Sequence, residues 1–576
     1  MIAINGVLYR LFASVVCDLL MKWALDESIL PQTQFGFVPG RSALDLVFIL
    51  LHCLAVVRKD CRLGSLVLVL VDFQAAYDSI DRGKLWRHLE ALGVSSYLLD
   101  ILIAMYREDV YVLYDGCLCP PVSPGQGLRQ GCPLSPLLFA LYISDLHYIF
   151  NPTDGAKTAN HQLRITDAEY ADDLALASNG MQGMQSMLLA LERYADTKGL
   201  VVNVEKTQAI VLGRTIRNGV LRYKGAPLTF VDSTKYLGIP FSKCMSLRGI
   251  GVSMHHLFTG GLARVWHIVH QHHLGDRILT FIRLMQAFAL SPGSYGSQLW
   301  AVVALGVQGE MSTLQEVSYM RFLKRILHVR TSAHNPSVLQ ECGVPPLRLY
   351  FWRMVLRFYN RLCLHNSPLV REVLSADIHA SPSRFLWSSH LLKAFEDIGD
   401  IVSVERMRGG QRIDVSAALR GVQAAIVRSW LHRTSDFRST RSVSPFYQEV
   451  SSLHPLQVGK TNLFRLTGAS YLGRYLSRQR QAALANFRLR CAPLSFLRSV
   501  RDDSGCAECS WCHMGVQDEH HLIFECPSLR MVHLRGRFAS LYQVNNLRSF
   551  FHQCPLRLSD FFKDLMMLCA SGHESG

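Results

Sequence analysis

The sequence lacks an apolar run long enough to cross a membrane. Its most apolar stretch, residues 46–57, contains His52, ends at Arg58 and Lys59, and falls short of the roughly 20 residues that a spanning helix needs. The first residues also lack the basic start and the small-residue cleavage site of a secretory signal. We therefore expect an intracellular protein whose 16 cysteines are free thiols or metal ligands rather than disulfides.

The sequence also lacks internal repeats and low-complexity tracts. Nothing in it resembles the nucleophile, base and orienting acid of a hydrolase triad. What it does have is length, because 576 residues with 49% hydrophobic content suffice for large buried cores. This length suggests roughly three or four domains.

Positive charge is concentrated in one part of the chain. Residues 405–501 contain 17 Lys and Arg against 4 Asp and Glu, so this basic window carries +13 of the formal net charge of +15. A solvated helical face with packed arginine stems is one interpretation. We favour a nucleic acid partner, because arginine binds phosphate and aromatic rings stack on bases. The aromatic residues interleaved with the charges are Trp430, Phe437, Phe446, Tyr447, Phe464, Tyr471, Tyr475 and Phe487.

Hydrophobic periodicity predicts an α/β region followed by helices. In the first part, helical patterns lie at 7–26, 42–58, 84–107, 133–150 and 182–199. Short strands are predicted at 65–73, 110–116, 173–178 and 208–213. This mixture indicates α/β structure with an antiparallel element. Between 245 and 400, apolar residues recur at spacings of three and four, which predicts helices.

Acidic residues stand at two strand ends. A run of β-branched and leucine residues, typical of a buried strand, ends on Asp72, and Asp172 and Asp173 fall at the tip of a tight hairpin. Each feature alone is commonly a solvated turn or a helix cap. Together they offer three carboxylates that a sheet can bring to one point. Mg²⁺ prefers such ligands, and two such ions clamp the attacking and leaving oxygens of a phosphoryl transfer.

Six sequence blocks resemble a known family in their order and spacing. They are QTQFGFVPGRS (32–42), VDFQAAYDSID (71–81), GLRQGCPLSPLLFALYISDL (127–146), YADDLAL (170–176), KGLVVNVEKTQAIVL (198–212) and TKYLGIPFS (234–242). The chain resembles reverse transcriptases of the non-LTR (LINE-type) retrotransposon family over nearly all of this first part. The resemblance implies a right-hand polymerase palm with partial fingers and an antiparallel sheet. An α-helical thumb and a helical C-terminal region with a small zinc knuckle would follow.

The resemblance also implies roles for individual residues. Asp72, Asp172 and Asp173 match the catalytic aspartates that hold two Mg²⁺ ions. The backbone carbonyl of Phe73 matches a further metal ligand. Tyr77 matches the aromatic gate that excludes a ribose 2′-hydroxyl, so the incoming nucleotide would be a deoxynucleotide; plain core packing is the alternative for this ring.

Three further segments match parts of the family that contact nucleotide and primer. Gln130 and Gly131 match a loop against the nascent base pair, where glycine lets the backbone approach; a proline-stiffened helix N-terminus is a compatible interpretation. Lys206 matches a lysine that contacts phosphate or protonates pyrophosphate, with a surface lysine as the alternative. The primer-grip turn is matched by Tyr236, Leu237 and Gly238.

The C-terminal part contains a metal-binding pattern. The spacing C-x2-C-x8-H-x4-C, two close pairs separated by a loop, suits a tetrahedral Zn²⁺ and is formed by Cys509, Cys512, His521 and Cys526. Free cysteines are the alternative, and the spacing leaves open competing ligands at Cys506, His513 and His520. The family has a C-terminal zinc knuckle, and this resemblance favours the first set. It implies one structural Zn²⁺ in a nucleic-acid reader.

The sequence also departs from the family pattern. Ala75 stands where the family very often has a basic residue. The chain starts just after the fingertip block that would carry an arginine for the triphosphate, and neither an upstream endonuclease nor a Pro-Asp motif after Cys526 is found. We therefore expect an N-terminally truncated or partial element product that forms a palm but polymerises poorly.

These features predict five segments and a function. The segments are partial fingers and palm (1–243), helical thumb and connection (244–400), basic helical nucleic-acid-binding region (401–504), zinc knuckle (505–530) and helical tail (531–576). We expect an RNA-directed DNA polymerase that takes an RNA template, a DNA primer or target and dNTPs, binds no membrane and acts in the nucleus. The alternative is a retrotransposon remnant that only binds nucleic acid. A group II intron maturase is disfavoured, because that architecture has no C-terminal knuckle.

Overall fold

The computed structural model describes residues 6–107, 113–115, 117–118, 125–160, 162–213, 219–306, 313–434, 468–473, 476–492, 494 and 508–571. No helix in these ranges is both long and apolar enough to span a membrane. The chain divides into two units. Unit 1 comprises Met1–Ser246, Tyr359–His390 and Met407–Arg412, and unit 2 comprises Leu247–Phe358, Leu391–Arg406 and Ile413–Gly576. The helical region expected at 244–400 is thus shared between the two units.

Unit 1 is built around a five-stranded sheet with the order β11-β8-β1-β7-β6. Neighbouring strands are antiparallel except for β11 and β8. The strands are β1 (Ser65–Val71), β6 (Asp167–Tyr170), β7 (Asp173–Ser178), β8 (Gln208–Gly213) and β11 (Thr229–Phe230). The shorter two-stranded sheets are β2 (Leu113–Tyr114) with β3 (Cys117–Leu118), β4 (Ala156–Lys157) with β5 (Arg164–Ile165), β9 (Arg222–Tyr223) with β10 (Ala226–Pro227), and β12 (Ser233–Tyr236) with β13 (Ile239–Ser242).

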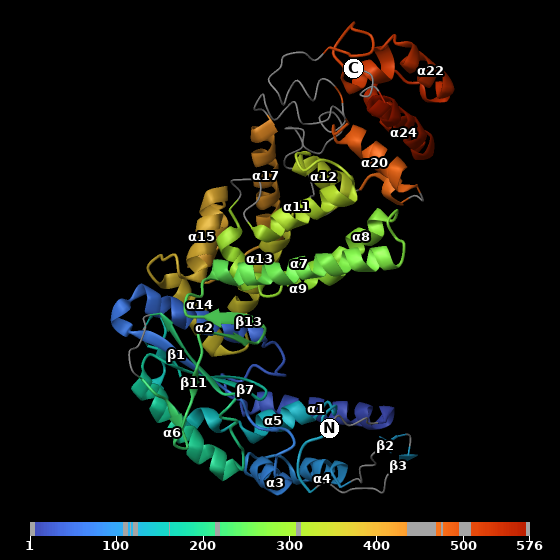
Figure 1. The fold of residues 1–576 in the computed structure, drawn as a ribbon. Coiled ribbons are helices and arrows are strands. Elements are labelled where there is room, and N and C mark those ends of the chain that lie inside the picture. The colour runs from blue at the N-terminus through green and yellow to red at the C-terminus, as the bar shows by residue number, and fades with distance from the viewer. Residues whose placement is uncertain are drawn as a thin grey trace. The chain divides into compact units, whose positions relative to one another are not determined.

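Helices cover both faces of the five-stranded sheet. Those of unit 1 are α1 (Val7–Asp26), α2 (Ala43–Lys59), α3 (Arg82–Ala91), α4 (Ser96–Met105), α5 (Ser135–Tyr142), α6 (Met181–Lys198) and α14 (Pro368–His379). Figure 1 shows the sheet between α2 on one side and α6 on the other. Strand β1 is buried along nearly its whole length, because its alternating side chains enter a hydrophobic layer on each face. The sheet therefore holds the end of β1 rigidly.

Two helical patterns in the sequence are interrupted in the structure. The pattern at 84–107 forms two helices, α3 and α4, because the chain turns at Gly93 with a φ of 93°. An L-residue rarely adopts this conformation, whereas glycine does so without strain. The pattern at 133–150 forms α5 and then a short 3₁₀ helix at Leu146–Ile149. Apolar spacing alone did not reveal either interruption.

Unit 2 is helical. Its main helices are α7 (Leu247–Gln271), α8 (Ile278–Met285), α11 (Leu314–Ile326), α12 (Asn335–Cys342), α17 (Val415–Thr434), α20 (Arg478–Arg488), α22 (Leu529–Arg537), α23 (Leu547–Phe551) and α24 (Pro555–Ser571). The division between the units falls inside α13 (Leu347–Cys363), α15 (Trp387–Ile398) and α16 (Ile401–Arg408). Long helix α7 packs against α8 and α11, and α20 packs against α24.

Candidate functional site

Asp72 lies directly after the buried strand β1, as the sequence predicts. Its backbone N–H donates to the Thr207 hydroxyl at 3.2 Å, and its carbonyl accepts from the Asn203 N–H at 2.7 Å. The loop that precedes β8 therefore fixes the backbone at this point. The Asp72 side chain lies at the C-terminal end of this central strand and is partly open to solvent. The margin of the sheet at these strand ends is called the acidic edge below.

The paired aspartates lie on the hairpin that joins β6 and β7. Tyr170 and Asp173 form its last strand pair, so Ala171 and Asp172 are the two residues of the turn, and Ala171 has a φ of 59°. The prediction that the acids stand at a hairpin tip is confirmed. Because β7 pairs with β1 up to Leu174 and Val71, Asp173 and Asp72 leave adjacent strands at the same edge. Figure 1 shows β1 and β7 in the sheet that carries these residues.

The charged groups at this edge act on one another's ionisation. The pKa of Asp173 is raised by its partial burial and by the negative charges of Asp172 and Asp72. The pKa of Tyr77 is raised to about 12, chiefly by burial and then by Asp172 and Asp173. Three carboxylates that repel one another at one sheet edge favour the binding of cations. Their oxygens are not gathered to the spacing of a closed metal site, which among the described residues is found only in a Cys/His cluster.

The predicted steric gate, Tyr77, packs beside the aspartates. Its ring stacks on Phe139 of α5 with centroids 5.1 Å apart. The Tyr77 ring is only partly buried. It packs against the core and also borders the acidic edge, so its position is compatible with core packing and with the role of a steric gate. Phe73, next to Asp72, pairs through its backbone with Val202.

The loop with Gln130 and Gly131 lies against the segment that carries Tyr77. The Leu128 N–H donates to the Tyr77 carbonyl at 2.7 Å, and the Gln130 amide nitrogen lies 3.3 Å from the Asp78 carboxylate. Gly131 has a φ of 101°, a conformation for which glycine is suited. Helix α5 begins four residues later, so the loop is also the approach to a helix N-terminus. The structure thus places Gln130 and Gly131 near Tyr77, the predicted steric gate.

The other predicted contacts approach from two loops. Lys206 is exposed in the loop before β8, and its N–H donates to the Asn203 side chain, whose own backbone holds Asp72. The β12–β13 hairpin turns at Leu237 and Gly238, both with positive φ, which is typical of a tight two-residue hairpin. The buried Tyr236 hydroxyl donates to the carbonyls of Ala168 at 3.4 Å and Asp173 at 3.5 Å. The predicted primer-grip hairpin therefore touches the hairpin of the aspartates.

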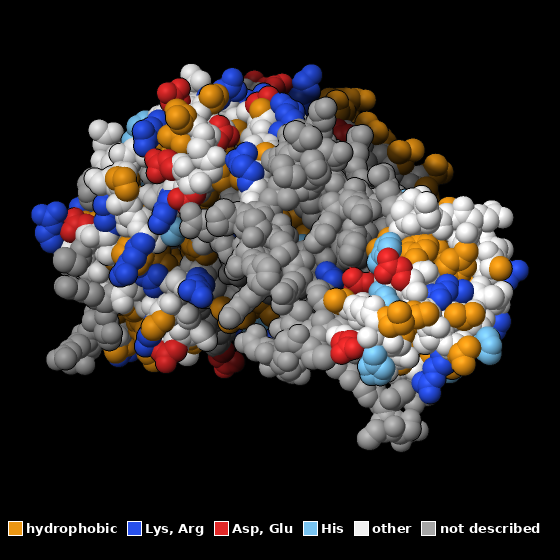
Figure 2. Space-filling model, turned by 90° about the horizontal axis from the view of Figure 1, so that it is seen from above, with side chains coloured by type: hydrophobic (Ala, Val, Ile, Leu, Met, Phe, Trp, Pro, Cys, Tyr) orange, Lys and Arg blue, Asp and Glu red, His pale blue; other side chains and the backbone are white. Residues whose placement is uncertain are grey.

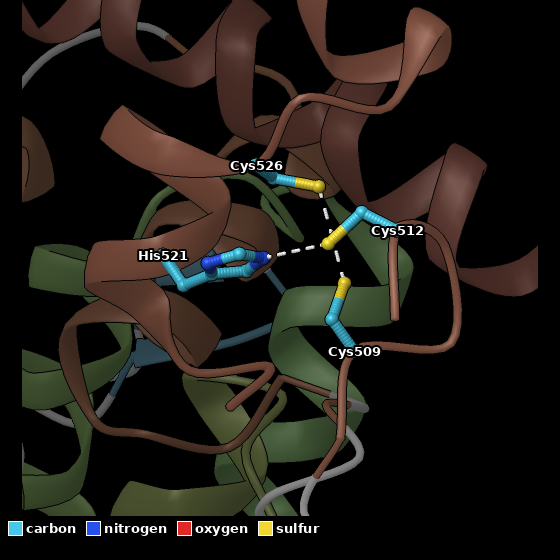
Figure 3. Close-up of side chains that lie close together, drawn as sticks. All are labelled: Cys509, Cys512, His521 and Cys526. Carbon is cyan, nitrogen blue, oxygen red and sulfur yellow. Dashed lines mark hydrogen bonds between the residues drawn. The ribbon is translucent and has the colours of Figure 1, made fainter. Parts of the chain in front are cut away.

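A second site in unit 2 consists of the four residues that the spacing predicted. One ligand atom from each lies within 4.8 Å of all the others, and the residues are Cys509, Cys512, His521 and Cys526. Figure 3 shows the three sulfur atoms and the imidazole pointing toward one another. The Cys512 sulfur lies 3.2 Å from His521 Nε2, and the Cys509 and Cys526 sulfurs are 3.9 Å apart. Three thiols and one imidazole at this spacing form a donor set suited to Zn²⁺.

The surroundings of this cluster orient His521 and shift the pKa values of two cysteines in opposite directions. His521 Nδ1 faces Glu525 at 3.6 Å, which leaves Nε2 directed at the sulfurs. Burial raises the pKa of Cys509 to about 11. Burial also acts to raise the pKa of Cys526, but hydrogen bonds from Ser528 and from the other cysteines outweigh it and leave the pKa below its usual value. Such hydrogen bonds favour a thiolate, the form that binds zinc.

Two of the three competing ligands, His513 and His520, take no part in this cluster. Side chains of His513 and His520 are largely exposed and lie near Glu508 and Glu525, respectively. Cys506 lies outside the described residues. Within the described part of the chain, the structure therefore agrees with the set that the family resemblance favoured.

The aromatic residues of the basic window divide into two groups. Phe437, Phe446, Tyr447, Phe464 and Tyr475 lie outside the described residues. Trp430, Tyr471 and Phe487 are 9%, 2% and 0% exposed, so these three rings pack in the interior and the expectation that they stack on bases is wrong for them. On the face drawn in Figure 2, the coloured Lys and Arg side chains stand among acidic and apolar ones. Trp430 and Phe487 lie on α17 and α20, and helices that pack against other elements need apolar side chains on the packed face.

Sequence reasoning missed one group of residues beside the aspartates. Gln34, Gly36 and Glu169 surround the hairpin turn at Ala171, and all three are buried. Gln34 and Gly36 lie inside the first family block, but no chemistry was assigned to them. The signal in the sequence is a glutamate on the strand that leads into the hairpin, two residues before Ala171. A carboxyl group that becomes buried on such a strand requires a hydrogen-bonding partner.

Comparison with known proteins shows which family the first part of this chain is similar to. Residues 1–241 match the family described as reverse transcriptase (RNA-dependent DNA polymerase). The first part of the chain therefore contains a reverse transcriptase domain. Its relatives among curated proteins come from non-LTR retrotransposons, which confirms the resemblance seen in the sequence blocks.

Two of these relatives show the extent of the similarity. The chain is 28% identical over 242 residues to the transposon TX1 uncharacterized 149 kDa protein of Xenopus laevis, covering 41% of this chain and 18% of that protein. It is also 28% identical over 333 residues to the Pol polyprotein of the type-2 retrotransposable element R2DM of Drosophila melanogaster, covering 55% and 30%. The chain thus spans less than a third of the length of these relatives. Among solved structures, telomerase from Candida albicans aligns with 70% of this chain and 59% of that chain at 13% identity, with a TM-score of 0.31.

Proposed function

We propose that this protein is an RNA-directed DNA polymerase that extends a primer 3′-hydroxyl with dNTPs on an RNA template. The observation that carries the proposal is the convergence of Asp72, Asp172 and Asp173 at one sheet edge beside Tyr77. The match of residues 1–241 to the reverse transcriptase family supports it. In this proposal the DNA primer or target is reached in the nucleus.

The three aspartates fit a pair of Mg²⁺ ions. Hard carboxylate oxygens at an open edge leave coordination positions for water and for phosphate oxygens of a substrate. When bound, such ions make the primer hydroxyl more acidic and neutralise the charge on the leaving pyrophosphate. Phe73 would add its backbone carbonyl to the ligands. Catalysis by the chain itself consists of holding these groups in place, and this explains why the acids stand on rigid strands.

The other residues of the site are proposed to position the nucleotide and primer. Tyr77 would occupy the space of a 2′-hydroxyl, with its ring held by Phe139. Gln130 and Gly131 would lie against the new base pair, and Lys206 would contact phosphate. The turn at Leu237 and Gly238 would support the primer end, since Tyr236 joins its hairpin to the hairpin of the aspartates.

The Cys/His cluster fits one structural Zn²⁺. Its four donor atoms match the ligand types and count of a closed zinc site. We propose that Zn²⁺ holds residues 509–526 in their fold and that this part of unit 2, together with the basic window, binds RNA or DNA. The excess of Lys and Arg in that window supports this partner class.

One assay tests the polymerase proposal. The purified chain is given an oligo(dT)-primed poly(rA) template, dTTP and Mg²⁺ or Mn²⁺, and the extended primer is measured for the wild type and for Asp172→Ala. Extension that disappears in the variant supports the proposal. If the wild type shows no extension but binds the RNA in a salt-sensitive manner, the chain acts only as a nucleic-acid-binding protein and the polymerase proposal fails.

A further inference from the structure

The turn that carries Asp172 is strained. A two-residue hairpin with positive φ at its first residue only is a type II′ turn, in which glycine is strongly preferred at that position. Here the position is taken by Ala171, with a φ of 59°, while Asp172 has a negative φ. An alanine in this region of conformational space is held there by its surroundings. The question is which group holds it.

The side chain of Gln34 makes the required contacts. Its carbonyl oxygen accepts from the Ala171 N–H at 3.2 Å and from the Gly36 N–H at 2.8 Å. Its amide nitrogen donates to the Glu169 carboxyl group at 3.0 Å. Gln34 is fully buried, so these bonds are made out of contact with water. One carboxamide thus joins the turn, the end of β6 and the 34–36 segment.

The backbone around Gln34 is itself fixed to β6. The Phe35 N–H donates to the Glu169 carbonyl at 2.7 Å, and the Glu169 N–H donates to the Thr33 carbonyl at 2.9 Å. Gln34 and Glu169 therefore face each other as a short parallel bridge at the edge of the sheet. The Arg41 guanidinium donates to the carbonyls of Pro31 and Gln34, both at 2.6 Å. These hydrogen bonds fix the backbone of Gln34 and so limit the movement of its carboxamide.

Gly36 allows this segment to approach the turn closely. A Cβ atom at this position would lie 2.2 Å from the Ala171 nitrogen and 2.8 Å from the Tyr170 carbonyl carbon. Both atoms belong to the backbone and cannot move aside as a flexible side chain can. Any larger residue would separate the segment from the turn, and the Gln34 contact with Ala171 would be lost.

We propose that Gln34 is a positioning residue of the polymerase site, whose carboxamide holds the Ala171 peptide in its left-handed conformation and so directs Asp172 and Asp173 at the metals and the substrate. This inference rests on the proposed function. It goes beyond the proposed function because it assigns control of the geometry of the two acids to a buried residue that lies 137 positions before Ala171. Gln34 acts through the turn and does not touch the reacting atoms.

The first test uses Gln34→Met, which keeps the length of the side chain and removes the donor and the acceptor. In the full chain, we expect kcat for primer extension to fall by about 100-fold, as for a small displacement of catalytic groups. The Mg²⁺ concentration for half-maximal rate should rise, while KM for dTTP changes less. Adding Ala171→Gly to this variant should restore about tenfold, because glycine adopts positive φ without a clamp.

The second test needs no catalysis. Hydrogen exchange of the backbone amides is measured in the free full-length protein, with peptides that cover residues 168–174. We expect exchange at Ala171 to be about tenfold faster in Gln34→Met, as for the loss of one hydrogen bond. Gly36→Ala should have the same effect. The matched control is Gln315→Met, because Gln315 is another buried glutamine, whose amide donates to the Gly251 carbonyl in unit 2; it should leave this peptide unchanged.

The outcomes separate the inference from the polymerase proposal. If the wild type does not extend a primer, the proposed function fails, and the exchange rates still decide whether Gln34 holds the turn. Unchanged exchange in Gln34→Met overturns the inference. It is also overturned if kcat falls only in proportion to folded protein, with the wild-type Mg²⁺ requirement and no restoration by glycine, since that result describes a residue with a purely structural role.

Discussion

Asp45, in the first turn of α2, forms an ion pair with Arg361, which lies more than three hundred positions further along the chain. The Asp45 carboxylate is completely buried and accepts two bonds from the guanidinium, at 2.5 and 2.9 Å. It also accepts from the Ser42 N–H at 2.8 Å and lies 3.2 Å from His365 Nε2. This one carboxylate both caps α2 and attaches the Tyr359–His390 segment to unit 1.

We predict that Asp45→Ala destabilises the protein strongly. The substitution removes the buried carboxylate that faces Arg361 and His365, while the Arg361 side chain, which is 37% exposed, keeps its bond to the Ser42 hydroxyl. Loss of a buried partner from such a pair costs about 3 kcal/mol. The urea midpoint of unfolding measures the loss. The control is Asp60→Ala at the end of the same helix, whose partner Arg62 is exposed, so that its pair contributes about 0 to 1 kcal/mol. Equal losses in both variants would contradict this account of Asp45.

Tyr77 should control the choice of sugar. Replacing it with alanine removes the ring that borders the acidic edge, so we expect kcat/KM for a ribonucleotide relative to the deoxynucleotide to rise by roughly tenfold or more. Steady-state single-nucleotide extension measures this ratio. Tyr77→Phe keeps the ring and its stacking on Phe139, and discrimination should survive. Loss of discrimination in the phenylalanine variant would point to the hydroxyl group instead.

The zinc site can be tested by metal content. Protein purified without chelator should contain about one zinc per chain, because the four ligands complete one tetrahedral site. His521→Ala should lose most of it, since Nε2 of this residue faces the Cys512 sulfur. The neighbouring His520→Ala is a matched control that should keep the metal, as its exposed ring lies beside Glu525. Zinc lost from both variants, or absent from the wild type, would refute the assignment.

Glu169 should make stability depend on pH. Burial and the nearby charge of Asp167 raise its pKa well above the usual value for a carboxyl group. The folded protein therefore retains a proton that the unfolded chain releases, so its free energy of unfolding falls as pH rises above the unfolded pKa. This loss is at most about 1.4 kcal/mol per pH unit.

The Glu169→Gln variant removes this titration. Its free energy of unfolding relative to the wild type should increase from pH 5 to pH 8, as measured by urea denaturation at both values. The exposed Glu205→Gln provides the control, with little change in the difference. If the difference in free energy of unfolding between wild type and Glu169→Gln were the same at both pH values, the pKa of Glu169 would not be raised in the folded protein.

The parts of the site that the sequence revealed are those with local patterns. A run of buried residues predicted β1 and placed Asp72 at its end, and the alternation after Asp173 predicted the hairpin. The Cys/His cluster was predicted because the two members of each closely spaced Cys or His pair must lie near one another in any fold. The remaining roles, such as those of Lys206 and Tyr236, are implied by the family blocks and stay predictions.

The sequence by itself therefore determined the chemistry that is available: three carboxylates at the ends of strands, an aromatic neighbour, and a set of three Cys and one His suited to a metal. Only the tertiary structure decided what holds these groups in place. Gln34 meets Ala171 and Asp45 meets Arg361 across long stretches of chain, and no periodicity encodes such pairs. Likewise, Trp430, Tyr471 and Phe487 are interior residues because packing covers them. Contacts between distant segments depend on how the whole sheet and its helices assemble, and this is information that local patterns do not contain.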